Sequence, residues 1–425
     1  MYSASEIMRD KSSRGSCVPL IRMCGPVLVL GAMGLLLPAR GPAQSMPAYL
    51  VATMTGSGPG NLPEGGYGGD GGPAASAVLN LPTSVAVGPA GDIYFCDWNA
   101  RIRKVDFRTG LVATIAGTGV RGFAGDGGPA VSALLGGPGR IAVDDAGNVY
   151  FADAYNQRVR QVSAATGIIT TVAGNGSEID RGESGVAIQV GIGIPSGIAV
   201  DAAGNLYISN GADRVRKVEA GTGNTIIVAG AGGSRSSGDG GPAVLAQLDQ
   251  PSGVALDAAG NLYIAARREN RIRKVDAATG IITTIAGASL GADSGVMGFV
   301  TYQGFFSGDG GPAIRAFLND PEGVAVDHAG NVYISDTMNY RVRRIDAATG
   351  IIHTIAGTGV RGFSGDGGLA LNAQITTPAG LSIDPAGRVY FADLFNQRIR
   401  ILSPLQPLPR SPLKEPGRVI LPLKQ

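Results

Sequence analysis

An acidic residue recurs at one position in each of six similar segments. It stands 24 residues before a Tyr that marks the segment, at Asp70, Asp126, Glu183, Asp239, Asp309 and Asp366. Repeated carboxylates are ligands that Ca²⁺ takes, so one interpretation is a ring of calcium sites. The alternative is structural: each carboxylate accepts hydrogen bonds from backbone N–H groups of a Gly-rich turn, near a short helical turn that starts at the next Pro. Because a feature present in every repeat is more typical of a scaffold than of a site, we favour the structural interpretation and expect no cofactor.

A stripe of Arg and Lys follows each Tyr, as in Arg271-Ile272-Arg273-Lys274-Val275. This alternation of charged and apolar residues predicts a half-exposed strand. The cations would form an anion-binding surface or pair across a hairpin with acids three residues after the Tyr, at Asp97, Asp153, Asp336 and Asp393. We favour pairing, since the pattern again recurs.

Aromatic and Arg residues gather in the connections between segments. Four aromatics lie three residues before the recurring acid, Arg121 and Arg361 lie in matching Val-Arg-Gly-Phe stretches, and the insertion Leu290–Phe305 adds more rings. Such residues are enriched at recognition surfaces, although the rings could instead fill gaps between segments. The candidate binding surface comprises Tyr67, Arg121, Phe123, Phe299, Tyr302, Phe305, Phe306, Arg361 and Phe363.

These residues are positioned by six copies of one unit. The marker residues are Tyr94, Tyr150, Tyr207, Tyr263, Tyr333 and Tyr390, at spacings of 56, 57, 56, 70 and 57 residues. The fourth unit predicts strands over 252–257, 262–265, 271–275 and 281–285, separated by tight turns. Four-stranded units in series predict an all-β fold, a β-propeller with six blades.

The two ends of this region complement each other. The sixth unit lacks a fourth strand, whereas residues 50–58 align without gaps on residues 111–119, the fourth strand of the first unit. We therefore expect the N-terminal strand to pair into the last blade and close the ring, which would span residues 48–401.

The units resemble the NHL repeat in its bacterial, teneurin-like form. The resemblance rests on a Gly-Asp-Gly-Gly-Pro-Ala lead-in, a Val-Ala-Val-Asp-x-x-Gly-Asn-x-Tyr core and the Arg-Ile-Arg-Lys-Val strand. It implies a six-bladed propeller. It does not fix an activity, because related propellers include interaction modules, extracellular sensors, lyases and lactonases.

Catalytic machinery is sparse in this sequence. After the first 43 residues there are two His, His328 and His353, and no Ser-His-acid set or phosphate loop. Arg140 and Glu322 replace small residues near the start of a first strand, which would place them at the mouth of the central channel. A metal-assisted lyase or lactonase-like hydrolase using that mouth is therefore the alternative function, and a purely structural envelope protein is a second. We assign no catalytic residue and no metal ligand, and we favour a binding propeller that recognises a protein or glycan through its long connections.

The two ends of the chain carry other signals. Residues 1–43 combine a basic start, an apolar run and small residues, which predicts a secretory signal peptide. Residues 402–425 form a Pro-rich tail. Between them, 26 Lys and Arg face 30 Asp and Glu, a net charge of −4 that argues against nucleic acid as a partner. We expect a secreted or periplasmic monomer with no membrane span in the mature chain.

Overall fold

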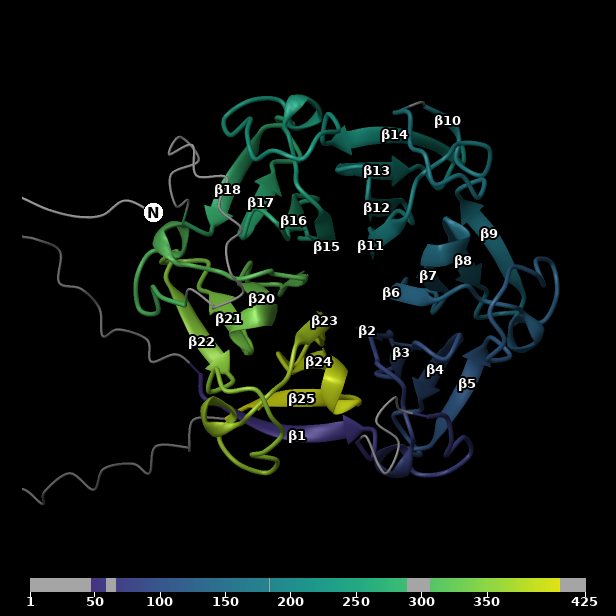
Figure 1. Ribbon diagram of the computed structural model, residues 1–425, viewed down its shortest axis with the longest axis horizontal. Coiled ribbons are helices and arrows are strands. Elements are labelled where there is room, and N and C mark those ends of the chain that lie inside the picture. Colours follow the sequence, from purple (N-terminus) through teal and green to yellow (C-terminus); the bar gives the residue numbers. More distant parts are fainter. Residues whose placement is uncertain (1–46, 59–65, 183, 289–305, 406–425) are drawn as a thin grey trace, which may run out of the picture. The chain divides into compact units, whose positions relative to one another are not determined.

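The computed structural model describes residues 47–58, 66–182, 184–288 and 306–405. Within them, antiparallel strands form six sheets that surround a common centre (Figure 1). The all-β, six-bladed propeller predicted from the sequence is confirmed. The predicted signal peptide, and the tail beyond residue 405, lie outside the described residues.

Each sheet runs from an inner strand to an outer strand. The inner strands are β2 (Ser84–Val87), β6 (Pro138–Val143), β11 (Pro195–Val200), β15 (Pro251–Leu256), β19 (Gly323–Val326) and β23 (Pro378–Ile383). The second strands are β3 (Ile93–Asp97), β7 (Val149–Asp153), β12 (Leu206–Asn210), β16 (Leu262–Ala266), β20 (Val332–Asp336) and β24 (Val389–Asp393). The third strands are β4 (Arg101–Val105), β8 (Arg158–Val162), β13 (Arg214–Val218), β17 (Arg271–Val275), β21 (Arg341–Ile345) and β25 (Arg398–Pro404). The outer strands are β5 (Val112–Ala116), β9 (Ile169–Ala173), β14 (Asn224–Ala229), β18 (Ile282–Ala286), β22 (Ile352–Ala356) and β1 (Tyr49–Thr55).

Strand β1 brings the start of the described chain to its end. It pairs antiparallel with β25, with Leu50 opposite Ser403 and Val51 opposite Leu402, and so supplies the outer strand of the sixth sheet (Figure 1). The inner strands of neighbouring sheets contact one another all the way round, and β23 contacts β2. The third sheet has one additional strand, β10 (Gly185–Val186), which pairs with β14.

Short 3₁₀ helices lie in the connections between strands on one face of the ring. Among the described residues, five precede inner strands, namely η1 (Ala74–Ser76), η2 (Ala130–Ser132), η4 (Ala243–Leu245), η5 (Ala313–Arg315) and η7 (Ala370–Asn372). Three lie between second and third strands, namely η3 (Ala154–Asn156), η6 (Thr337–Asn339) and η8 (Leu394–Asn396).

The ring has two distinct faces. Connections such as 117–137, from an outer strand to the next inner strand, share one face with the links between second and third strands; we call it the long-loop face. Tight turns such as 144–148 and 106–111 lie on the opposite face, the short-turn face. Antiparallel strands that alternate in direction place these two kinds of connection at opposite ends of every sheet.

The core lies between the blades, so both surfaces of most strands are buried. Phe95, Phe151 and Phe391 on the second strands have no exposed surface. The same arrangement corrects the prediction of a half-exposed third strand. Arg103 is fully buried beside the buried Ile102, whereas Lys104 stays partly exposed. A blade packed on both sides has no solvent face for alternate residues to occupy.

Candidate functional site

A fully buried arginine occupies the third position of the third strand in every blade. The six are Arg103, Arg160, Arg216, Arg273, Arg343 and Arg400, each with 0% exposure. In the first blade, Arg103 pairs with Asp70 at 2.6 Å and with Asp97 at 3.4 Å. A buried guanidinium must be neutralised and given acceptors for its N–H groups, because unpaired charge is costly in the interior.

The same two partners recur around the ring. The predicted pairing across the hairpin is confirmed, with Arg160 to Asp153 and Arg343 to Asp336 at 3.3 Å and Arg400 to Asp393 at 3.5 Å. The recurring loop acids also bind the buried arginines, which the sequence did not reveal. These pairs are Arg160–Asp126, Arg273–Asp239, Arg343–Asp309 and Arg400–Asp366, at 2.7 to 2.8 Å.

The loop acids therefore act mainly as arginine partners. We expected them to accept hydrogen bonds from their own Gly turn, but Asp70 accepts from Arg103, Tyr67 and the backbone of Thr114 on the outer strand. Burial opposes ionisation of Asp70, yet the hydrogen bonds from Thr114 and Tyr67 and the charge of Arg103 together lower its pKa. Glu183 lies outside the described residues. Among the residues that are described, no group of His, Cys, Asp or Glu could hold a metal ion.

In the third and fourth blades, the charge of the buried arginine is neutralised by acids at other positions of the repeat. Asp180 stands three residues before Glu183, where four of the other blades carry an aromatic, and it accepts hydrogen bonds from the Nε and Nη2 of Arg216. Arg273 pairs with Glu269 at 3.0 Å, because the position three residues after Tyr263 is an alanine. The buried arginine therefore has an acidic partner in these two blades as well, although the acid comes from a different position of the repeat.

The predicted aromatic residues stack on arginines of the long-loop face. In four of the six blades the first Arg of the third strand lies over a ring, at 3.6 to 3.9 Å from its centre, in the pairs Arg101–Tyr67, Arg158–Phe123, Arg341–Phe306 and Arg398–Phe363. Tyr67, Phe123 and Phe363 nevertheless keep 45%, 43% and 39% exposure. Each of these three rings is therefore held by a guanidinium and still exposes a little under half of its surface to solvent. Phe299, Tyr302 and Phe305 lie outside the described residues.

The two predicted loop arginines also contact rings. Arg121 lies 5.0 Å from the ring of Trp98 and 5.6 Å from that of Tyr155, and Arg361 lies 5.5 Å from the ring of Phe395. Trp98, Tyr155 and Phe395 were not among the predicted binding residues. Their signal was available, since all three are large rings in the otherwise short links between second and third strands.

The two residues predicted at the channel mouth meet each other. Arg140 extends from β6 to within 3.3 Å of the Glu322 carboxylate, and it also donates to Ser252 Oγ and the Thr83 carbonyl. Arg267 approaches Glu322 at 3.3 Å from another side. Burial lowers the pKa of Arg140, although Glu322 opposes the shift. Glu322 is thus engaged by two guanidinium groups, and the cavity beside Arg140 within the channel measures only about 40 Å³.

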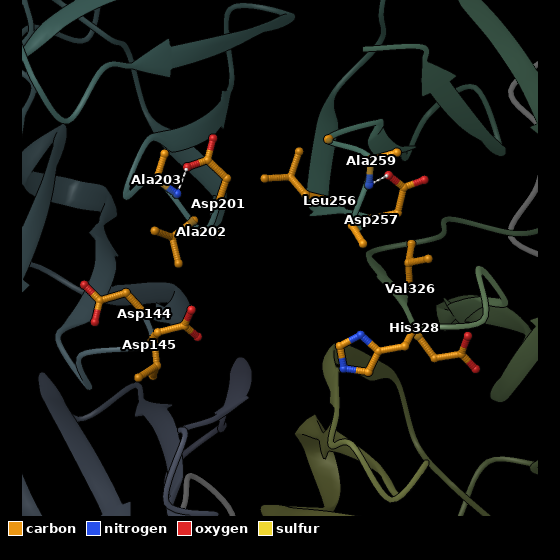
Figure 2. A pocket seen from close by; sticks show the side chains of 15 residues that line it. Asp144, Asp145, Asp201, Ala202, Ala203, Leu256, Asp257, Ala259, Val326 and His328 are labelled. Atoms are coloured by element: carbon orange, nitrogen blue, oxygen red, sulfur yellow. Dashed lines mark hydrogen bonds between the residues drawn. The ribbon is translucent and has the colours of Figure 1, made fainter. Parts of the chain in front are cut away.

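A larger cavity of about 530 Å³ opens on the short-turn face. It is lined by turns that carry Asp144, Asp201, Asp257 and Asp327 (Figure 2). These carboxylates are engaged within their own turns; Asp144, for example, accepts from the backbone and side chain of Asn148 and from the Tyr150 hydroxyl.

Two residues of this cavity depart from the repeat. Asp145 and His328 occupy turn positions that hold Ala202 and Ala258 in neighbouring blades, and they extend toward the middle of the cavity from opposite sides (Figure 2). Our expectation placed a site on the long-loop face, so these residues were not among its candidates. The signal that could have found them is their departure from alanine.

Comparison with known proteins agrees with the repeat architecture. The sequence model of the teneurin NHL domain matches residues 221–294 and 303–361. Human Teneurin-1 is 28% identical over 364 residues, covering 78% of this chain and 12% of that protein. The chain is a propeller of teneurin-like NHL repeats.

Two further proteins are similar to this NHL propeller. The Arabidopsis thaliana protein SUPPRESSOR OF QUENCHING 1, chloroplastic, is 29% identical over 261 residues, covering 60% of this chain and 24% of that protein. A crystal structure of a Bacteroides thetaiotaomicron protein of unknown function aligns with a TM-score of 0.60 at 19% identity, covering 84% of this chain and 76% of that one. The NHL propeller spans a quarter or less of the two curated relatives named here. In the described part of the chain, no helix has the length and apolar character needed to cross a membrane.

Proposed function

We propose that this NHL propeller is an interaction module that binds a partner protein through its long-loop face. The observation that carries this proposal is the set of half-exposed rings held by guanidinium groups on that face. A ring fixed in place before binding loses little conformational entropy when a partner covers it, and Trp, Tyr and Arg are enriched among the hot spots of protein interfaces.

The compartment proposed for this activity is the bacterial envelope or the medium. Its support is the sequence of residues 1–43, with the basic start, apolar run and small residues of a secretory signal. A module working there has to persist without an internal disulfide, because Cys96 is buried and unpaired within the described residues. The closed ring, with its charge pairs buried between blades, is a suitable scaffold for that role.

The test uses the full chain and a display library of random peptides as the probe. Peptides selected on the immobilised protein are measured against Phe123→Ala and Phe363→Ala, which remove rings from the long-loop face. We expect binding to weaken about tenfold or more, as for interface hot spots. Phe107→Ala is the matched control, since Phe107 is an aromatic of 51% exposure on the short-turn face.

Two outcomes would contradict the proposal. One is peptides that respond to Phe107→Ala but not to the long-loop substitutions. The other is a protein that selects no peptide at all. Thermal unfolding of each variant shows whether the fold is intact, which we expect because the three rings are partly in solvent.

A further inference from the structure

A cluster that occurs once among the described residues lies where the first two blades meet on the long-loop face. Trp98, the one tryptophan of the chain, meets Tyr155 edge to face, with ring centres 5.6 Å apart and planes at 70°. The Arg121 guanidinium lies over both rings, and its Nη2 donates to the Trp98 carbonyl at 3.3 Å. Trp98 is half-buried, whereas Tyr155 is 55% exposed and Arg121 is exposed.

The sequence makes room for this cluster. A side chain at Gly137 would place its Cβ 2.9 Å from the Tyr155 ring and 3.5 Å from Arg121 Nη1. The equivalent positions in the other units hold larger residues, namely Leu81, Ile194, Gln250, Asp320 and Thr377. The place of Trp98 is taken elsewhere by Ala154, Gly211, Arg267, Thr337 and Leu394. Gly137 and Trp98, which come from different parts of the sequence, thus both depart from the repeat at one point of the surface. The repeated scaffold does not require either departure.

Arg121 differs from the other arginines of this face in its partners. Arg101 and Arg158 each donate to two backbone carbonyls, which hold their charge inside the loop. Within the described residues, Arg121 has no ion pair and one hydrogen bond. The rings hold its guanidinium by cation–π contact, and its remaining N–H groups stay available to an acceptor.

We propose that Arg121 is the anchor for an acidic side chain of the partner protein, with Trp98 and Tyr155 packing against the neighbouring residue. A guanidinium matches a carboxylate with two parallel hydrogen bonds, and pre-ordering by the rings lowers the entropy lost on binding. The body of the chain is net negative, so it does not attract acidic peptides by its overall field. A preference for acidic peptides would therefore indicate that a local cation such as Arg121 binds them. This inference rests on the proposed function and names the chemistry of its central contact.

An exposed arginine on the opposite face offers a matched control. Arg108 lies in the turn 106–111 of the short-turn face, outside the candidate binding surface. Arg108→Gln therefore removes the same charge without touching the cluster or the long-loop face.

The experiment selects peptides from the random display library on the full-length protein and measures their affinity for three proteins. We expect the selected peptides to be enriched in Asp and Glu, and Arg121→Gln to weaken them about tenfold, or about 1.4 kcal/mol. Arg108→Gln should leave affinity within about twofold, well below a hot-spot effect. Because Trp98 is the only tryptophan, peptide binding should also change the intrinsic fluorescence of the wild-type protein.

The possible failures are distinguishable. Peptides that lack acids, or that bind Arg121→Gln as well as wild type, would overturn the anchor; sensitivity to Phe123→Ala would in that case leave the proposed function standing. Absence of any selected peptide would overturn both. Retention of a glucuronate polysaccharide with no acidic peptide selected would also overturn the anchor, because the ligand would then be a glycan.

Discussion

At the scale of single residues, the six fully buried arginines place positive charge inside every blade. Each of the six is surrounded by acids from the preceding loop, from its own hairpin, or from both. Replacing a whole buried ion pair by apolar residues is often neutral, but removing one partner leaves the other charge uncompensated. These arginines are therefore sensitive to single substitutions.

Arg343→Met provides a direct test. It leaves Asp309 and Asp336 without their cation, so we expect the free energy of unfolding to fall by about 3–5 kcal/mol. Arg315→Met is the control, because Arg315 is exposed in the 3₁₀ helix η5 of the same blade and should change stability by less than about 0.5 kcal/mol. Urea unfolding of both variants measures the difference, and equal stability would contradict the role given to the buried pair.

The carboxyls beside the buried arginines give stability an unusual dependence on pH. Burial raises the pKa of Asp97, Asp336 and Asp393 from 3.8 to about 6, although their arginine partners oppose the shift. Between these pH values the folded protein binds more protons than the unfolded chain. The contribution of these groups to the unfolding free energy therefore increases as the pH falls from 7 to 5. The lowered pKa of Asp70 affects the unfolding free energy only near and below pH 3.8, so it does not change the trend between pH 7 and 5.

Carboxyl NMR of protein labelled at Asp measures these titrations. We expect a set of Asp signals to titrate near pH 6, with one absent in Asp336→Asn. That variant should also show a smaller gain in unfolding free energy between pH 7 and 5. Titration of all Asp signals near pH 4 would contradict the effect of burial.

At the scale of elements, β1 holds the ring closed. Its residues alternate at first between the core and solvent, with Val51 fully buried in a cluster with Ile355 and Ala370, and Ala52 exposed. Its backbone also bonds to the loop before β23, through Val51 to Gly368 at 3.1 Å. The strand thus links the outer edge of the sixth blade to its lead-in loop.

Val51→Asp tests this closure. An unpaired carboxylate in an apolar cluster should lower the free energy of unfolding by at least about 3 kcal/mol and reduce the melting temperature. Ala52→Asp introduces the same charge one residue away on the exposed side and should have little effect. A melting curve of Val51→Asp that matches the control would show that β1 is dispensable.

Much of this element structure could be predicted because it repeats. The Tyr spacing identified six units, the turns separated four strands in each, and the acids after the second strand were matched with third-strand cations. The sequence could not show that Arg103 is fully buried while Lys104 stays partly exposed, because both surfaces of a third strand face neighbouring blades. It also could not connect Asp70 with Arg103, because that contact depends on how the loop folds back over the strand.

At the scale of the whole propeller, the two faces offer different chemistry. The long-loop face presents rings stacked on arginines and the Trp98, Arg121 and Tyr155 cluster. The short-turn face opens a cavity lined by carboxylates, with Asp145 and His328 across it (Figure 2). The channel between them is crossed by Arg140 in contact with Glu322, so each face is a separate surface for recognition.

Hydrogen–deuterium exchange of the full-length protein, with and without a selected peptide, tests most directly which face binds. Our account predicts slower exchange in the long-loop segments around residues 98–101, 120–124 and 154–158, with no change in the turns at 144–148 and 257–261. Protection of those turns with no change around Arg121 would place binding in the acidic cavity and contradict the account.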